Sequence, residues 1–197
     1  IENNSGEDIE VFPYRLIKRI NTPDTINFFI LHEGLISLLN DELLEKNYDD
    51  MAEDCSSSLQ TKKSFCDNAS KGGWLGFTDK YWMSALIPDS EQSINVNYRH
   101  SNNGRDNYRA GYVGQIYEIK PNNNLTYGGK LFVGAKKLDI LSNYDENLSI
   151  VRFTDAIDWG WFSFLTKPVS YAINWFYDKV KNFGIAIIAF TILMRLI

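Results

Sequence analysis

The feature that most limits the possible folds of this chain is an apolar run at residues 183–194, which contains no charge before Arg195. As an α-helix, the stretch from Phe183 to the end would rise about 22 Å, less than the ~30 Å hydrocarbon core of a bilayer. Such a run is either a buried core helix or the start of a longer transmembrane helix. We favour the second interpretation and expect a larger parent protein, because the chain begins at Ile1 rather than Met and ends inside the run.

An amphipathic helix is predicted just before this run. Thr166 is expected to be its N-cap, and Pro168 to lie in the first turn, where a missing N–H has no cost. The following residues separate into an apolar face (Val169, Ala172, Ile173, Phe176 and Val180) and a polar face (Ser170, Asn174, Asp178 and Lys181). This helix either packs against the rest of the protein or lies flat in a membrane interface.

Aromatic residues are concentrated around the same helix. Trp and Tyr collect at membrane interfaces, where the ring meets an apolar phase and the polar group stays hydrated. We therefore favour an interfacial helix. The residues expected at the membrane interface are Trp159, Trp161, Phe162, Phe164, Trp175 and Phe176.

Arg195 is the residue with the clearest chemical consequence. If the apolar run descends from the interface, Arg195 lies about 18 Å into the bilayer. Its guanidinium stays protonated and costs at least ~2.5–3.5 kcal/mol if it faces lipid, so it would need protein, water or an acidic partner. Alternatively, Arg195 ends a short tilted segment and extends to the headgroups. Thr191, on the same face, would either line the same polar cavity or bond to a carbonyl of its own helix.

Residues 1–150 are predicted to be mostly β-structure. Stretches rich in β-branched and aromatic residues alternate with turn-forming Pro, Asn, Asp and Gly, which is typical of an antiparallel sandwich. The candidate strands are residues 24–31, 81–87, 93–99, 109–119 and 129–133. Helical spacing of leucines also predicts helices at residues 35–46 and 135–143.

Cys55 and Cys66 are the two cysteines of the chain. They are either unrelated thiols of a surface loop or a local disulfide, which would require an oxidising compartment. The residues around them lack the spacing of a zinc site. The net charge of −5 and scattered basic residues argue against nucleic-acid binding.

Three stretches carry specific motifs. Residues 72–88 read GGWLGFTDKYWMSALIP, and residues 131–139 read LFVGAKKLD. The third stretch runs from Asp158 through Pro168 and Trp175 to Arg195. Together they resemble the YidC family of bacterial membrane protein insertases. His32-Glu33-Gly34 fits that family less specifically, and Ala135 replaces the family's usual proline, which puts only the local backbone geometry in doubt.

The resemblance implies a mainly β fold. It would be an incomplete supersandwich-like antiparallel β-sandwich, followed by an amphipathic interfacial helix and a truncated transmembrane helix. The expected divisions are residues 1–156 for the later part of a periplasmic sandwich, 157–182 for the interfacial helix region and 183–197 for the transmembrane start. In such a fold, residues 35–46 would be strand and loop rather than helix.

The resemblance also implies a function. The chain would belong to an insertase and chaperone of the bacterial inner membrane, with residues 1–156 in the periplasm. Five transmembrane helices would enclose a hydrophilic groove, and Arg195 and Thr191 match the family's groove arginine and its polar neighbour. Expected partners are nascent membrane proteins, the Sec translocon with its accessory subunits, and the lipid bilayer. No cofactor, metal or catalytic residue is expected.

Two other function classes remain open at this point. The supersandwich also resembles sugar mutarotases, which use His and a carboxylate for acid–base chemistry, and His32 and His100 are the two histidines here. The other is a membrane-tethered module whose sandwich binds another envelope protein.

Overall fold

The structure is a computed structural model that describes residues 1–25, 31–57, 63–160 and 162–196. These residues form two compact units, 1–157 and 158–197. The first unit is a β-sandwich with one short layer of helix, and the second contains helices α3 and α4. The chain is therefore mainly β with helices at its C-terminal end, as the sequence predicted.

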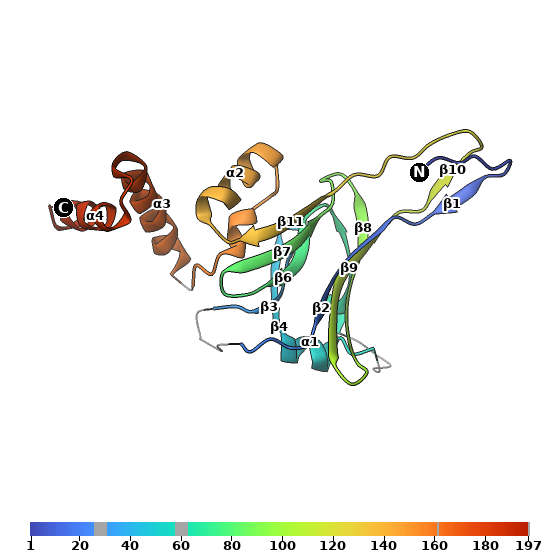
Figure 1. Cartoon of the computed structure of the whole chain (residues 1–197), viewed down its shortest axis with the longest axis horizontal. Helices are drawn as coiled ribbons and strands as arrows, with labels where there is room; N and C mark the ends of the chain where they lie inside the picture. The colour runs from blue at the N-terminus through green and yellow to red at the C-terminus, as the bar shows by residue number, and fades with distance from the viewer. Residues whose placement is uncertain (26–30, 58–62, 161, 197) are drawn as a thin grey trace. The chain divides into compact units, whose positions relative to one another are not determined.

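Two antiparallel sheets form the sandwich (Figure 1). The five-stranded sheet has the order β11-β7-β6-β3-β4, and the four-stranded sheet has the order β2-β9-β8-β5. The strands of the first are β3 (Gly34–Leu39), β4 (Glu42–Asn47), β6 (Trp74–Thr78), β7 (Trp82–Ile87) and β11 (Lys130–Ala135). Those of the second are β2 (Tyr14–Ile20), β5 (Asp67–Lys71), β8 (Ser93–Asn102) and β9 (Asp106–Gly114).

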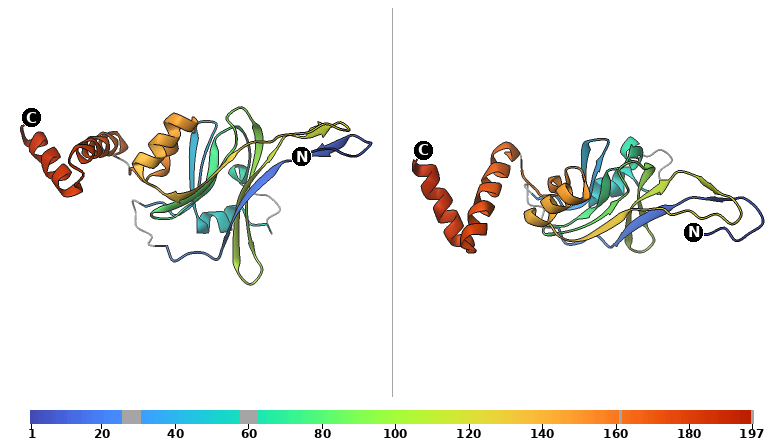
Figure 2. Two further views of the ribbon diagram at one scale, coloured as in Figure 1. Left: turned by 45° about the horizontal axis from the view of Figure 1, so that its top comes forward. Right: turned by 90° about the horizontal axis from the view of Figure 1, so that it is seen from above.

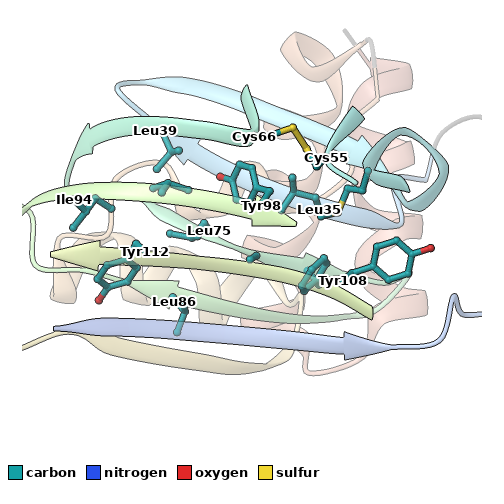
Figure 3. Packing of buried hydrophobic residues seen from close by; sticks show 14 of the residues in the cluster. Leu35, Leu39, Cys55, Cys66, Leu75, Leu86, Ile94, Tyr98, Tyr108 and Tyr112 are labelled. Carbon is teal, nitrogen blue, oxygen red and sulfur yellow. A yellow bond between two sulfur atoms is a disulfide. The ribbon is translucent and has the colours of Figure 1, made fainter. Parts of the chain in front are cut away.

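The main core fills the space between the two sheets. Strand β8 alternates buried and more exposed side chains, because successive residues of a strand point to opposite faces. Figure 3 shows the resulting contacts between Ile94, Tyr98, Tyr108 and Tyr112 of the four-stranded sheet and leucines of the other sheet. Each of these side chains is buried.

A second core covers the opposite face of the five-stranded sheet. Helix α2 (Leu138–Leu148) and the 3-10 helix η2 (Phe153–Ala156) pack there. Trp74 lies at its centre, with its ring 5.4 Å from that of Phe153 and its indole N–H donating to the Val151 carbonyl at 3.1 Å. The central strands β3 and β6 of the five-stranded sheet are thus buried on both faces.

This double burial explains why the pattern-based prediction of a helix at residues 35–46 is wrong. All six residues of β3 are buried, so the strand shows a continuous apolar run instead of the alternation that marks a half-exposed strand. Asn40 and Asp41 both have positive φ angles, 51° and 64°, and connect β3 to β4 in a tight hairpin. The strand and loop implied by the family resemblance are confirmed.

The structure confirms several of the other predicted helices and strands and differs from the rest. Strands at residues 81–87, 93–99 and 129–133 correspond to β7, β8 and β11, and the predicted helix at 135–143 overlaps α2. Residues 109–119 divide between the end of β9 and β10 (Tyr117–Ile119), which pairs with β1 (Ile9–Val11) in a two-stranded ribbon visible in Figure 2. Most of the predicted strand at 24–31 lies outside the described residues. The sequence did not predict β1, β2, β4, β5, β6 or α1 (Tyr48–Asp54) as separate elements.

The two lateral edges of the sandwich differ. At one edge, α1 and the 3-10 helix η1 (Ser64–Cys66) connect β4 of one sheet to β5 of the other, and a disulfide joins Cys55 to Cys66. At the other edge, side-chain contacts connect β2 to the facing sheet: Arg19 pairs with Asp79 at 3.1 Å, and Arg15 donates to the Gly129 carbonyl at 3.2 Å. A pocket of about 240 Å³, lined partly by Arg19, Trp82 and Val133, opens there.

The disulfide should contribute strongly to stability. Both sulfur-bearing side chains are fully buried, and the bridge closes a short loop, which is worth about 3 kcal/mol in the chain-entropy model. A Cys55→Ser/Cys66→Ser variant should therefore unfold at a distinctly lower urea concentration than the oxidised chain. Reductant should lower the midpoint of the native chain to a similar value and leave the variant unchanged. Equal midpoints for the oxidised chain and the variant would contradict this expectation.

Candidate functional site

Helices α3 (Ser163–Val180) and α4 (Phe183–Leu196) meet at a two-residue turn and form the second unit (Figure 2). Lys181 adopts a left-handed conformation and its N–H donates to the Tyr177 carbonyl at 2.6 Å, which ends α3. Asn182 then caps α4, since its side-chain oxygen accepts a bond from the Ile185 N–H at 3.2 Å. The ring of Tyr177 also lies 5.5 Å from that of Phe183, across the turn.

The predicted start of α3 is wrong by one turn. The helix begins at Ser163 with Phe162 as N-cap, so Thr166 lies inside the helix and Pro168 in its second turn. The Thr166 hydroxyl donates to the carbonyls of Trp159 and Phe162, at 2.9 and 3.3 Å, instead of accepting a bond as an N-cap does. These two bonds stabilise the aromatic first turn, although an N-cap at Thr166 would have placed its residues before the helix.

Apolar side chains of this unit are largely exposed. Among its described residues, only Ala186 is buried. The exposed large apolar residues of α4 are Phe183, Ile185, Ile187, Ile188, Ile192, Leu193, Met194 and Leu196. A continuous exposed surface of this kind marks a site of contact with a membrane or with another protein. None of the helices within the described residues is both long and apolar enough to cross a bilayer.

The predicted interface aromatics lie along α3 and just before it. Phe164 and Trp175 are 76% and 58% exposed, whereas Phe176 is half-buried and its ring packs edge-on against Trp175 at 5.0 Å. Phe162 is exposed and in ring contact with Phe164 at 6.1 Å. Trp159 precedes the helix, and Trp161 lies outside the described residues.

Arg195 lies in the last turn of α4, where its side chain is exposed among apolar neighbours. It is the only charged residue of that helix. Thr191 lies four positions earlier on the same face, and its hydroxyl donates to the Ile187 carbonyl at 2.8 Å. Of the two roles considered for Thr191, the structure therefore shows the bond within its own helix.

Three lysines lie over aromatic rings in this unit, and these contacts were not predicted from the sequence. Lys179 is 5.8 Å from the centre of the Trp175 ring, and Lys181 is 5.8 Å from that of Tyr177. In both pairs the lysine follows the aromatic residue by four positions at the C-terminal end of α3, a spacing that could have revealed them. Lys167 is 5.6 Å from the ring of Trp159, a contact that depends on the turn before the helix.

The two histidines have separate partners. His32 Nε2 is 2.8 Å from the Leu35 carbonyl oxygen, and His100 Nε2 is 2.8 Å from Asp106 Oδ1 in the β8–β9 hairpin. The hydrogen bond with His100 is the main cause that lowers the pKa of Asp106, and a second bond from Asn102 acts in the same direction. His100 is buried and its ring packs on Tyr108 at 4.9 Å, so this pair has the surroundings of a structural contact in the hairpin.

A family model described as the YidC periplasmic domain matches residues 1–172. The chain belongs to this family. The match covers the whole sandwich and the first part of α3.

Curated relatives match over the whole chain. It is 39% identical over 198 residues to the membrane protein insertase YidC of Rickettsia bellii, and 39% identical over 198 residues to that of Rickettsia akari. Identity to the membrane protein insertase YidC of Rickettsia prowazekii is 40% over 200 residues. Each comparison covers 100% of this chain and 34% of the relative. The chain therefore spans about a third of the length of these relatives, and α4 with Arg195 lies within the matched third.

Proposed function

We propose that this chain is the part of a bacterial membrane protein insertase that connects a periplasmic sandwich to a membrane-embedded groove. Arg195 is the observation that carries the proposal. A single exposed guanidinium in an otherwise apolar helix is unfavourable on lipid and useful where a polar group has to be received within a membrane. Membership of the YidC periplasmic domain family supports this assignment.

The mechanism we infer is transient capture. The polar or acidic extracellular part of a substrate enters a hydrated groove beside Arg195, while its apolar segment passes into lipid. A charge-assisted hydrogen bond between Arg195 and a substrate carboxylate would offset part of the cost of moving that group out of water. Thr191, whose hydroxyl is already bonded within α4, would contribute its remaining acceptor capacity to the groove wall.

The same proposal gives the location and partners. Residues 1–156 would lie in the periplasm, 157–182 at the outer surface of the inner membrane and 183–197 inside it. Substrates would be nascent membrane proteins, and the Sec translocon is the expected protein partner. Strand β2 supports a protein-binding role of the sandwich, because its outward-facing Tyr14, Leu16 and Ile20 are exposed on an edge strand.

A chimera tests the proposed function. The corresponding third of a relative's full-length YidC protein is replaced by this chain, and the chimera is expressed in cells depleted of their own insertase. We expect insertion of a small membrane protein with an acidic extracellular tail, measured by protease protection of that tail. The unmodified relative is the positive control. A chimera that reaches the membrane intact and leaves the tail uninserted would contradict the proposal.

A further inference from the structure

The lysines of the helical unit share one arrangement. Lys179 lies in the last turn of α3 and Lys181 is the C-cap of that helix, whereas Lys167 lies near the other end of α3. Each ammonium group lies within 5.6–5.8 Å of the centre of an aromatic ring. Lys179 and Lys181 are exposed to solvent in addition. The arrangement therefore places positive charge next to rings of the type that prefer the boundary between lipid and water.

Charge in this unit is opposite in sign to that of the whole chain. Residues 158–197 contain four basic side chains, the three lysines and Arg195, against two acidic ones, Asp158 and Asp178, whereas the chain has a net charge of −5. Lys181 contacts Asp178 at 3.3 Å, which neutralises part of its charge. Lys179 has no acidic partner among the ion pairs found in the described residues. Of the two units, the one with a basic excess is thus also the one with exposed apolar helices.

These two observations identify a ligand class. An apolar helix that lies in an interface has its flanking lysines at the depth of the phospholipid phosphates. Positive charges near a membrane strengthen binding to anionic lipids, whereas they add little on a zwitterionic surface. Lys179 lies in the last turn of α3 and Lys181 caps that helix, so these two lysines are held close together where α3 ends.

We propose that Lys167, Lys179 and Lys181 bind the phosphate groups of anionic phospholipids, so that the α3–α4 hairpin selects anionic over zwitterionic membrane. This inference rests on the proposed placement of α3 at the membrane surface. It adds a lipid class and three contact residues to that placement. The rings of Trp159, Trp175 and Tyr177 position the ammonium groups and insert beside the same headgroups.

Vesicle flotation of the whole chain tests the inference. Two kinds of vesicle are used, phosphatidylcholine alone and phosphatidylcholine mixed with phosphatidylglycerol. We expect tighter binding to the anionic vesicles, by about fivefold for each effective lysine, and a loss of this preference at high salt. A Lys179→Gln/Lys181→Gln variant should lose roughly five- to twentyfold in affinity for the anionic vesicles and little for the neutral ones.

Matched variants separate a lipid site from a general charge effect. Lys18→Gln/Lys120→Gln removes the same number of charges from exposed positions of the sandwich unit and should bind as the native chain does. Asp178→Asn frees Lys181 from its ion pair and should raise the preference for anionic vesicles. Circular dichroism of each variant checks that helix content is retained, because lysines in the last turn also stabilise a helix.

The outcomes are distinct. Equal binding of the native chain to both vesicle types would overturn the inference and leave an interfacial placement of α3 standing. Equal loss with the two lysine pairs would show that the hairpin lysines are not a site, which also overturns it. Failure to bind either vesicle type would contradict the interfacial placement itself, on which the proposed function depends.

Discussion

Replacement of Arg195 by alanine in a full-length insertase carrying this segment should lower insertion of an acidic-tailed substrate by about 10- to 100-fold. The estimate follows from the about 1.5–3 kcal/mol that a hydrogen bond to a charged group contributes, a difference that acts directly on the barrier to insertion. Arg195 is the only charge of α4, so within that helix no other side chain can replace it. Arg195→Lys should retain most of the activity, because it keeps the charge and a donor. Insertion is measured by protease protection of the tail.

The substrate provides a control for the same experiment. A substrate whose acidic tail residues are replaced by neutral ones should depend far less on Arg195, because it offers no carboxylate to pair with the guanidinium. Thr191→Val provides a second comparison, since the Thr191 hydroxyl is bonded to Ile187 and its removal should have a smaller effect than loss of the charge. Normal insertion by both Arg195→Ala and Arg195→Lys would contradict electrostatic capture and leave groove hydration and helix packing as the basis of the activity.

Replacement of Trp74 by alanine should destabilise the sandwich by about 3–5 kcal/mol, the usual cost of deleting a large aromatic side chain from a core. Trp74 is fully buried and contacts the ring of Phe153, so the change removes much of the connection between the five-stranded sheet and η2. It also deprives the Val151 carbonyl of its indole donor. The shift in the urea unfolding midpoint of the whole chain gives the measurement.

Trp82→Ala is the matched control for this prediction. Trp82 is 62% exposed on the neighbouring strand β7, so the same deletion should change stability by only about 0.5 kcal/mol. Similar losses for the two tryptophans would show that the second core contributes less than its burial indicates.

The sandwich could be predicted where one face of a strand is exposed. Strand β8 alternates Ile94, Val96 and Tyr98 inward with polar residues outward, and such a pattern is readable from the sequence. Strand β3 is buried on both faces, so its leucines carry no alternation and resemble a helix. Strand β2 was missed for a different reason, because its pattern is reversed. The apolar Tyr14 and Leu16 face outward, whereas the charged Arg15 and Arg19 contact the facing sheet.

The candidate site shows a similar division. Arg195 and the aromatic residues around α3 could be singled out because charge and aromatic density can be read from the sequence without knowing the fold, and their roles at the membrane stay predictions. The contact of Lys167 with Trp159 could not be predicted from the sequence. It depends on the hydrogen bonds that the Thr166 hydroxyl donates to the turn before the helix. The disulfide could not be predicted with certainty either, because the sequence does not show that α1 and η1 bring Cys55 and Cys66 together.

The unequal edges of the sandwich determine how its two layers can separate. A covalent bond and a helix restrain the β4–β5 side, whereas the β2 side is held by non-covalent contacts, among them those of Arg15 and Arg19. A force that separates the two layers would therefore part them first at the β2 side, with the disulfide-bonded side acting as a hinge. The sandwich can thus open at the β2 side while the strands on the disulfide-bonded side keep their positions.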